Sequence, residues 1–148
     1  MSDSEVISAA SDLLHGFKSR LQEAFTEAGI VLSPVEFKVL RVIQHATQCT
    51  SQDLVRELER DKAQIARIVA ALNVKELINR QPNPNDKRSQ ILSISSKGND
   101  ILVTCEQPER QVVASMIGNT SCEDREQCLR VLRMLYGNLS KDHCNSPL

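Results

Sequence analysis

The sequence predicts a mainly α-helical protein that carries a single β-hairpin. Over most of the 148 residues, apolar side chains recur at three- and four-residue steps, which is the period of an amphipathic helix. This period is lost around residues 80–94, where two extended runs flank the sequence NPNDKR, which is rich in turn-forming residues. Capping residues, together with Gly and Pro at helix ends, divide the rest of the chain into separate helices.

Residues 4–28 are expected to form one long helix that ends at Gly29. Because a helix of about 25 residues is longer than a small domain needs for its own core, we expect part of its apolar face to pack against a helix of a second molecule. That face carries Ile7, Leu14, Phe17, Leu21 and Phe25.

Two capped helices follow. Ser33, Pro34 and Glu36 supply an N-cap, a Pro at the first helical position and a capping-box Glu. The helix that they open directs a set of apolar side chains towards the core: Phe37, Val39, Leu40, Val42 and Ile43. Thr50, with Asp53 three residues later, caps a short helix over residues 51–58.

The next helix is expected to begin at Lys62, because Asp61 is a good N-cap and the Gln64 side chain can bond back to the N–H of the cap. Its apolar stripe consists of Ile65, Ile68, Val69, Leu72 and Ile78, and the rest of the cylinder carries Lys62, Gln64, Arg67, Ala71 and Lys75. One face therefore suits a core, whereas the other is small, polar and cationic.

The hairpin follows, with strands expected at residues 80–82 and 90–94 and with Lys87 and Arg88 at its tip. About three residues separate the 51–58 helix from the Lys62 helix, which is the spacing of a helix-turn-helix. In that motif the second helix enters the major groove of DNA. The sequence therefore predicts a winged helix-turn-helix whose wing has two strands.

Two more helices complete the chain. Ser95 caps a helix that ends near residue 117, Gly118 and Asn119 break it, and Ser121 opens a last helix that bears Leu129, Leu132, Leu135 and Leu139. With the N-terminal helix, these segments hold more apolar surface than a small winged-helix core can cover. We expect an intertwined helical dimerisation region, in which a twofold axis sets two recognition helices about 34 Å apart on a near-palindromic site.

The stretch from Asp61 to Gly98 resembles the recognition helix and wing of the MarR (multiple antibiotic resistance regulator) family of winged helix-turn-helix repressors. The shared features are the DK that opens the helix, the LINR before the hairpin, the D-x-R wing signature in Asp86-Lys87-Arg88, and the SxxG start of the next helix. They occur in order at fixed spacing, and the resemblance extends over nearly all of the chain. The multidrug-efflux repressor branch is the most similar.

The resemblance implies one MarR-like domain over residues 1–148, with a DNA-binding lobe at 30–98 and a helical dimerisation region at 4–28 and 99–142. One position departs from the family pattern, because Glu76 stands where the family usually has Gly at the end of the recognition helix. Gly adopts the left-handed conformation most easily. Either Glu76 takes that conformation at a cost in free energy, or the helix ends differently here.

The charge distribution supports a DNA partner although the net charge is only −1. Residues 56–97 hold nine Lys or Arg against five Asp or Glu, whereas the rest of the chain holds nine against fourteen. The basic excess coincides with the predicted helix-turn-helix and wing, as expected for a protein with a defined docking face for nucleic acid. A solvated face that carries this excess by chance is the alternative.

Five candidate DNA contacts lie in the predicted helix-turn-helix. Gln64 and Arg67 are one turn apart on its outward face, where Gln can bond adenine and Arg can bond guanine. A simple phosphate contact is the alternative for Arg67. Thr50, Ser51 and Lys62 lie near helix starts and suit phosphate oxygens.

The wing supplies the other candidates. The planar guanidinium of Arg88 fits a narrow minor groove, and the matching Arg does this in the family. Lys87 beside it is a further DNA contact. Asp86 would repel phosphate, so we expect it to brace the wing by pairing with Arg80 or Arg88, or else to be a plain turn residue.

The cysteines offer a second, weaker hypothesis. None of Cys49, Cys105, Cys122, Cys128 and Cys144 lies in the first helix, where the peroxide-sensing branch of the family keeps its reactive Cys, and there is no CxxC motif. Most are expected to be small buried hydrophobes, with Cys49 and Cys144 as candidates for a redox role. His45 and Cys49, four residues apart, are a candidate Cys–His pair or half of a metal site, but we expect no metal or cofactor.

We therefore expect a dimeric, DNA-binding repressor that is not an enzyme. The resemblance implies an effector, a small amphipathic or phenolic compound, that binds between the dimer helices and the DNA-binding lobe. A thiol-based redox regulator of the same fold and a winged-helix module that binds an acidic protein partner are the alternatives. Because the sequence shows no long apolar run and no signal-peptide pattern, we expect a cytoplasmic protein that does not enter a membrane.

Overall fold

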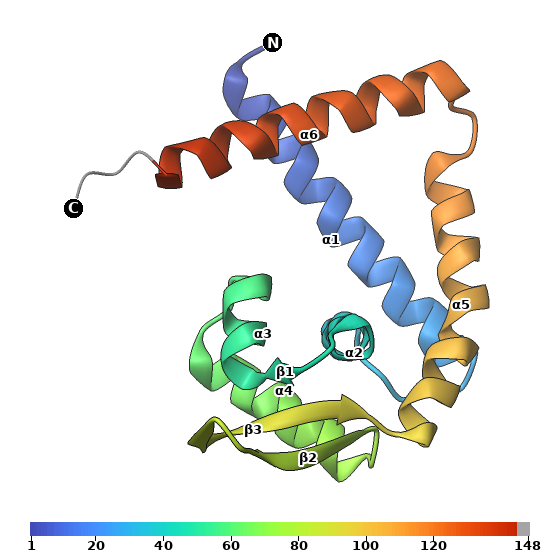
Figure 1. Ribbon diagram of the computed structural model, residues 1–148. Helices are drawn as coiled ribbons and strands as arrows, with labels where there is room; N and C mark the ends of the chain where they lie inside the picture. The colour runs from blue at the N-terminus through green and yellow to red at the C-terminus, as the bar shows by residue number, and fades with distance from the viewer. Residues whose placement is uncertain (145–148) are drawn as a thin grey trace. The chain divides into compact units, whose positions relative to one another are not determined.

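The computed structural model describes the backbone of residues 1–144 and the side chains of residues 1–140 (Figure 1). Two compact units can be distinguished, Met1–Val112 and the part that begins at Val113, and each is described by itself. The elements in chain order are α1 (Asp3–Glu27), α2 (Pro34–His45), β1 (Cys49–Thr50), α3 (Ser51–Leu58), α4 (Lys62–Val74), β2 (Ile78–Asn83), β3 (Asp86–Ile94), α5 (Ser96–Ile117) and α6 (Cys122–Cys144). The mainly helical winged helix-turn-helix is thereby confirmed.

The predicted caps set the helix starts. Ser33 and Glu36 exchange both bonds of a capping box, each at 3.2 Å, and Thr50 does the same with Asp53. At α4 the carboxylate of Asp61 accepts the Gln64 N–H at 2.8 Å. The expected return bond from the Gln64 side chain to Asp61 is not formed, because an exposed cap N–H can bind water and fixing a long side chain there gains little free energy.

The sheet differs from the predicted two-stranded wing. Three antiparallel strands lie in the order β1-β3-β2, and Cys49 of β1 pairs with Leu92 of β3. A strand of two residues leaves no periodic signal in the sequence, which explains why β1 was missed. The wing strands are also longer than expected. Ile78 begins β2 instead of ending the helix, and Lys87 and Arg88 lie in β3 just after a two-residue turn.

The core of the first unit is built around α2, which contacts α1, α4 and β3 and is seen end-on in Figure 1. Every member of this core is apolar. Phe25 of α1 and Phe37 of α2 pack edge to face with ring centroids 5.3 Å apart. From the other elements, the core takes Leu54 of α3, Ile65, Val69 and Leu72 of α4, Leu77 and Ile78 at the start of the wing, and Leu102 and Cys105 of α5. Of the five α2 side chains that were expected in the core, four are buried and Val42 is only partly buried.

The end of α4 shows which of the two expected conformations Glu76 adopts. Its φ is +60°, so this residue adopts the left-handed conformation usual for Gly. The N–H of Leu77 bonds the carbonyl of Leu72 and the N–H of Glu76 bonds that of Asn73, each at 3.0 Å, which is the Schellman pattern. The helix therefore ends in the left-handed conformation that was one of the two alternatives for this position, and Glu76 carries the strain.

Gly98 of the SxxG motif is required by a close approach. Ser95 accepts the Gly98 N–H at 3.0 Å, which caps α5 as predicted. A Cβ at position 98 would lie 2.2 Å from the carbonyl oxygen of Leu77. The start of α5 is thus pressed against the residue that follows the strained end of α4.

Apolar side chains remain exposed on two helices. Leu129, Leu132, Leu135 and Leu139 of α6 are all exposed, as are Ile7 and Leu14 in the first half of α1. Neither helix buries these residues within its own unit. None of the described helices is both long and apolar enough to cross a membrane.

Replacing Glu76 with Gly should stabilise the protein. Gly removes a left-handed strain of roughly 1–2 kcal/mol, part of which its greater freedom in the unfolded chain cancels, so we expect the free energy of unfolding in urea to rise by about 1 kcal/mol. The Glu76→Ala variant is the control, because it removes the same exposed ion pair with Lys97 and keeps the strain. A Gly variant no more stable than the Ala variant would contradict the strain.

Candidate nucleic-acid interface

The outward face of α4 is flat except for one long side chain. Ala63, Arg67, Ala70 and Val74 are exposed at steps of four, three and four residues, and so form one stripe along the helix. The opposite stripe is buried in the core. Small residues let a helix approach the floor of the major groove, and Arg67 projects from the middle of the stripe, where it can reach a base edge.

Two further predicted residues flank this stripe. Lys62 is exposed at the first position of α4, and Gln64 is half-buried beside the stripe. Val74 was not among the predicted contacts, because an apolar side chain in a helix is ordinarily expected in the core, yet this side chain is 81% exposed. An apolar group at that place can contact the methyl group of thymine.

The structure weakens the case for Thr50 as a phosphate contact. Its hydroxyl accepts the Asp53 N–H and lies 3.0 Å from the Asp53 carboxylate. Hydrogen bonds, first from the Thr50 backbone, lower the pKa of Asp53, and Arg56 adds to this. A carboxylate beside the hydroxyl repels a phosphate group. Ser51, at the first position of α3, stays exposed.

The wing tip is shaped by side chains that bond the local backbone. Asn83 accepts the Asn85 N–H at 3.0 Å and Asp86 accepts the backbone N–H of Arg88 at 2.9 Å. The expected ion pair of Asp86 with Arg80 or Arg88 is not formed in the described part of the chain, because the carboxylate is already used by the turn.

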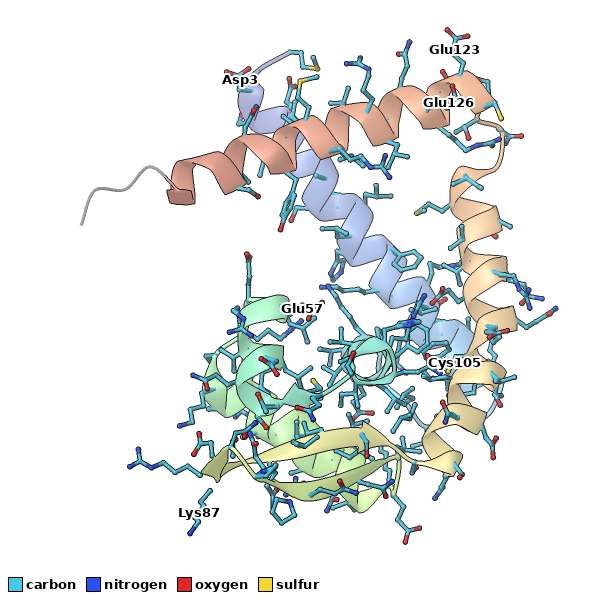
Figure 2. All side chains as sticks on the ribbon, viewed as in Figure 1. Asp3, Glu57, Lys87, Cys105, Glu123 and Glu126 are labelled. Atoms are coloured by element: carbon cyan, nitrogen blue, oxygen red, sulfur yellow. The ribbon has the colours of Figure 1, made fainter. Side chains whose placement is uncertain are left out.

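The basic side chains of the wing remain at the surface. Arg80, Lys87 and Arg88 are all exposed, and Figure 2 shows Lys87 at the end of the hairpin. None of the acidic side chains within residues 1–140 forms an ion pair with them. They are available to phosphate or to a groove.

A cavity of about 730 Å³ is lined by residues of α1, α2, α3 and α5 and the ends of these helices. Its walls are largely apolar, with Phe17 and Phe37 among them. Four Lys or Arg side chains, one His and two carboxylates also line it: Lys18, Lys38, Arg41, Arg60, His45, Glu57 and Glu109. Arg41 donates two bonds to the Glu109 carboxylate, at 2.8 and 3.1 Å, and its guanidinium lies 4.9 Å from the centre of the Phe37 ring. An anion with an apolar body matches this lining.

The thiols in the first unit are poorly suited to redox sensing. Burial raises the pKa of Cys49 to about 11, with help from the charges of Asp53 and Glu57. Burial and the nearby Glu109 do the same for Cys105, which Figure 2 shows on α5. A reactive thiol needs a lowered pKa, so the structure argues against Cys49.

The remaining cysteine hypotheses fare differently. Cys122 and Cys128 are exposed, and the side chain of Cys144 lies outside the described residues. The His45–Cys49 pair is wrong as a shared helix face, because α2 ends at His45 and Cys49 is buried in β1. No group of metal-binding side chains occurs among the residues that the structure describes.

Comparison with known proteins gives a consistent result. The sequence model of the MarR family matches residues 32–90, which include α2, α3, α4 and most of the wing. The transcriptional regulator MhqR of Bacillus subtilis is 28% identical over 112 residues, which cover 76% of this chain and 77% of MhqR.

Two solved structures share the fold. A mutant MarR from Escherichia coli, complexed with operator DNA, has a TM-score of 0.81 and 22% identity over 88% of this chain and 93% of that one. BpsR of Bordetella bronchiseptica, in a structure on the regulation of its DNA binding by 6-hydroxynicotinic acid, has a TM-score of 0.79 and 18% identity over 92% and 96%. The basic winged helix-turn-helix, the match to the MarR family model over residues 32–90 and the related regulators together lead to one conclusion: this chain is a DNA-binding transcriptional regulator that is similar to the MarR family.

Proposed function

We propose that this regulator is a homodimeric repressor that binds a near-palindromic operator and releases it when a small amphipathic acid fills the cavity beside α2. The observation that carries the proposal is the exposed stripe on α4, where one Arg stands among small residues and a wing with exposed basic side chains follows. This arrangement suits a helix that enters the major groove and a hairpin that reaches the neighbouring minor groove.

Each candidate contact takes the role that its position allows. Arg67 reads guanine, with Gln64 beside it able to bond adenine. Lys62 and Ser51 bind phosphates near helix N-termini. Arg88 enters the minor groove, where a narrow groove concentrates negative potential, and Lys87 binds the adjoining backbone.

The exposed apolar residues support a dimer. Monomeric soluble proteins rarely leave large contiguous apolar patches exposed, yet leucines along α6 and in the first half of α1 face solvent. A second copy of the chain would cover them. A twofold dimer then sets the half-site spacing at one turn of DNA, about 34 Å.

The cavity supports an acidic effector. Its apolar walls suit an aromatic ring, and its basic side chains suit a carboxylate. A carboxylate that enters would compete with Glu109 for the guanidinium of Arg41, and a fork-shaped donor of this kind binds carboxylates in a bidentate manner. The ligand named for BpsR, 6-hydroxynicotinic acid, has this combination of ring, hydroxyl and acid, so it and benzoate are suitable probes.

The central test is selection of duplexes from a random pool by the purified full chain. We expect enrichment of a near-palindrome whose half-sites are one helical turn apart, and elution of the protein as a dimer in gel filtration. Addition of 6-hydroxynicotinic acid or benzoate should weaken binding to the selected duplex. A pool that stays random, or binding that does not weaken with salt, would rule out operator recognition.

The Arg88→Ala variant should lose operator affinity without losing its fold. Removal of a groove-bound Arg is expected to weaken binding about tenfold or more at physiological salt and to lower the log–log salt slope by about 0.9 for each phosphate that is no longer neutralised. Gel shifts measure both quantities. Arg110→Ala, which removes an exposed Arg from α5, is the control, and equal affinities for the two variants would show that the wing assignment is wrong.

The Arg67→Ala variant should lose discrimination at one base step. Removal of a bidentate bond to guanine costs roughly 1–3 kcal/mol against the other bases, so competition among duplexes that differ at single positions should reveal one position where preference disappears. If the variant instead binds every duplex more weakly by the same factor, Arg67 contacts phosphate only.

Cys49 and Cys105 should be unreactive in the folded protein. Their pKa rises from an ordinary 9.0 to about 11, so a variant with Cys122, Cys128 and Cys144 replaced by Ser should react with Ellman's reagent at pH 7.5 only slowly until urea unfolds it. Because the folded state binds these thiol protons more tightly, their contribution to stability should persist below pH 9 and be lost as the pH rises towards 11. Rapid labelling of this variant, or loss of its operator binding in peroxide, would favour the thiol-based alternative.

A further inference from the structure

Lys75 connects the end of α4 to the start of α2. It is the C-cap residue of α4, and its Nζ donates to the Glu36 carboxylate at 2.7 Å and to the Val31 carbonyl at 3.1 Å. Both side chains are largely buried, with 31% of Lys75 and 15% of Glu36 exposed. An ion pair with this little exposure to water is held in one geometry more firmly than a surface pair.

Glu36 is itself fixed by the cap of α2. The carboxylate oxygen that receives the Lys75 ammonium, Oε2, also accepts the N–H of Ser33 at 3.2 Å. One ammonium group therefore joins three parts of the first unit: the α1–α2 connection, the first turn of α2 and the last turn of α4. Lys75 is 44 positions from Val31 and 39 positions from Glu36 in the chain.

The opposite side of the same junction is held by the start of α5. The Ser95 hydroxyl donates to the Glu76 carbonyl at 2.7 Å, and the Ser95 N–H donates to the Leu77 carbonyl at 3.0 Å. Gly98 lies too close to that carbonyl to admit a Cβ. The corner between α4 and the wing is thus fixed on one side by Lys75 and on the other by Ser95.

We propose that Lys75 is a positioning residue for operator recognition, which acts through Glu36 to fix the axis of α4 and its exit into the wing relative to α2. The inference rests on the proposed function, since it assumes that α4 and the wing read DNA. Base contacts need short, directional bonds, so a small displacement of α4 removes them. Attraction to phosphates depends mainly on the number of basic groups and changes little with such a displacement.

The test compares specific with non-specific binding. Lys75→Met keeps the length of the side chain and removes the ion pair. Lys97→Met is the matched control, because Lys97 lies near the same corner, is 63% exposed and makes only a 3.8 Å contact with Glu76. Both variants lose one positive charge. The ratio of affinities for the selected operator and for a random duplex of equal length, at one salt concentration, should fall at least tenfold for Lys75→Met and stay within twofold for Lys97→Met.

Further variants separate positioning from stability. Lys75→Arg should restore the ratio, because Arg can bond the same carboxylate. Glu36→Gln replaces the charged acceptor with a neutral one and should lower the ratio, whereas Lys75→Met also removes the bond to the Val31 carbonyl. The double variant should be no worse than Lys75→Met alone, because that change already removes the ion pair. Circular dichroism at the assay temperature establishes that each variant is folded, and Glu36→Gln carries the test if Lys75→Met does not fold.

Two results would overturn the inference. If Lys75→Met weakens operator and random duplex by the same factor, Lys75 contributes only charge or stability. If folded Lys75→Met or Glu36→Gln keeps the ratio of the parent, the ion pair does not position α4. A parent protein that shows no preference for any duplex would refute the proposed function as well, so the two failures are distinguishable.

Discussion

The first unit depends on the burial of one face of α2. Phe37, Leu40 and Ile43 from that face are almost completely removed from water, and each such side chain contributes about 1.5–3 kcal/mol relative to an exposed position. Because α1, α4 and β3 all contact α2, rotation of this helix would uncover apolar surface on three neighbours at once. The helix therefore acts as the fixed reference for the rest of the DNA-binding lobe.

The same helix has a second face that is not committed to the core. The cavity is lined by three polar side chains of α2: Lys38, Arg41 and His45. On the first turn of the same helix, the Glu36 carboxylate binds the ammonium of Lys75. A ligand in the cavity would thus contact the helix that supports the recognition helix. Such a ligand can shift α4 only if it binds two arrangements of α2 with different affinity, and a ligand carboxylate that displaced Glu109 from Arg41 would have this effect if the displacement let α2 move relative to α5.

Local signals in the sequence were enough to predict most elements. Ser33, Thr50, Asp61 and Ser95 each placed a helix start correctly, because a cap and its partner lie within three residues of each other. The interactions that connect the elements were not predictable in this way. Arg41 and Glu109 are 68 positions apart, and no periodicity or motif links the two residues before the chain has folded.

In the candidate site, too, most local features were predicted correctly and contacts between elements were not. The outward face of α4 followed from the helical period, so Arg67 was placed correctly on the surface. Asp86 bonds Arg88, one of the two expected partners, but through the backbone N–H and not through the ion pair that the charges suggested. Lys75 was expected on the polar face of the helix, but its bond to Glu36 was not predicted, because folding brings together two residues that are 39 positions apart in the chain.

Glu76 shows why a locally unfavourable residue can persist at such a corner. Its left-handed backbone costs roughly 1–2 kcal/mol, but the next residue, Leu77, is 1% exposed, and its burial offsets a cost of this size. Ser95 bonds the carbonyls of both residues, so any other backbone conformation at Glu76 would break these bonds and expose Leu77. The surrounding contacts therefore impose at Glu76 a left-handed conformation that Gly adopts most easily, and the bonds that Ser95 makes keep the exit from α4 into the wing in place despite the strain.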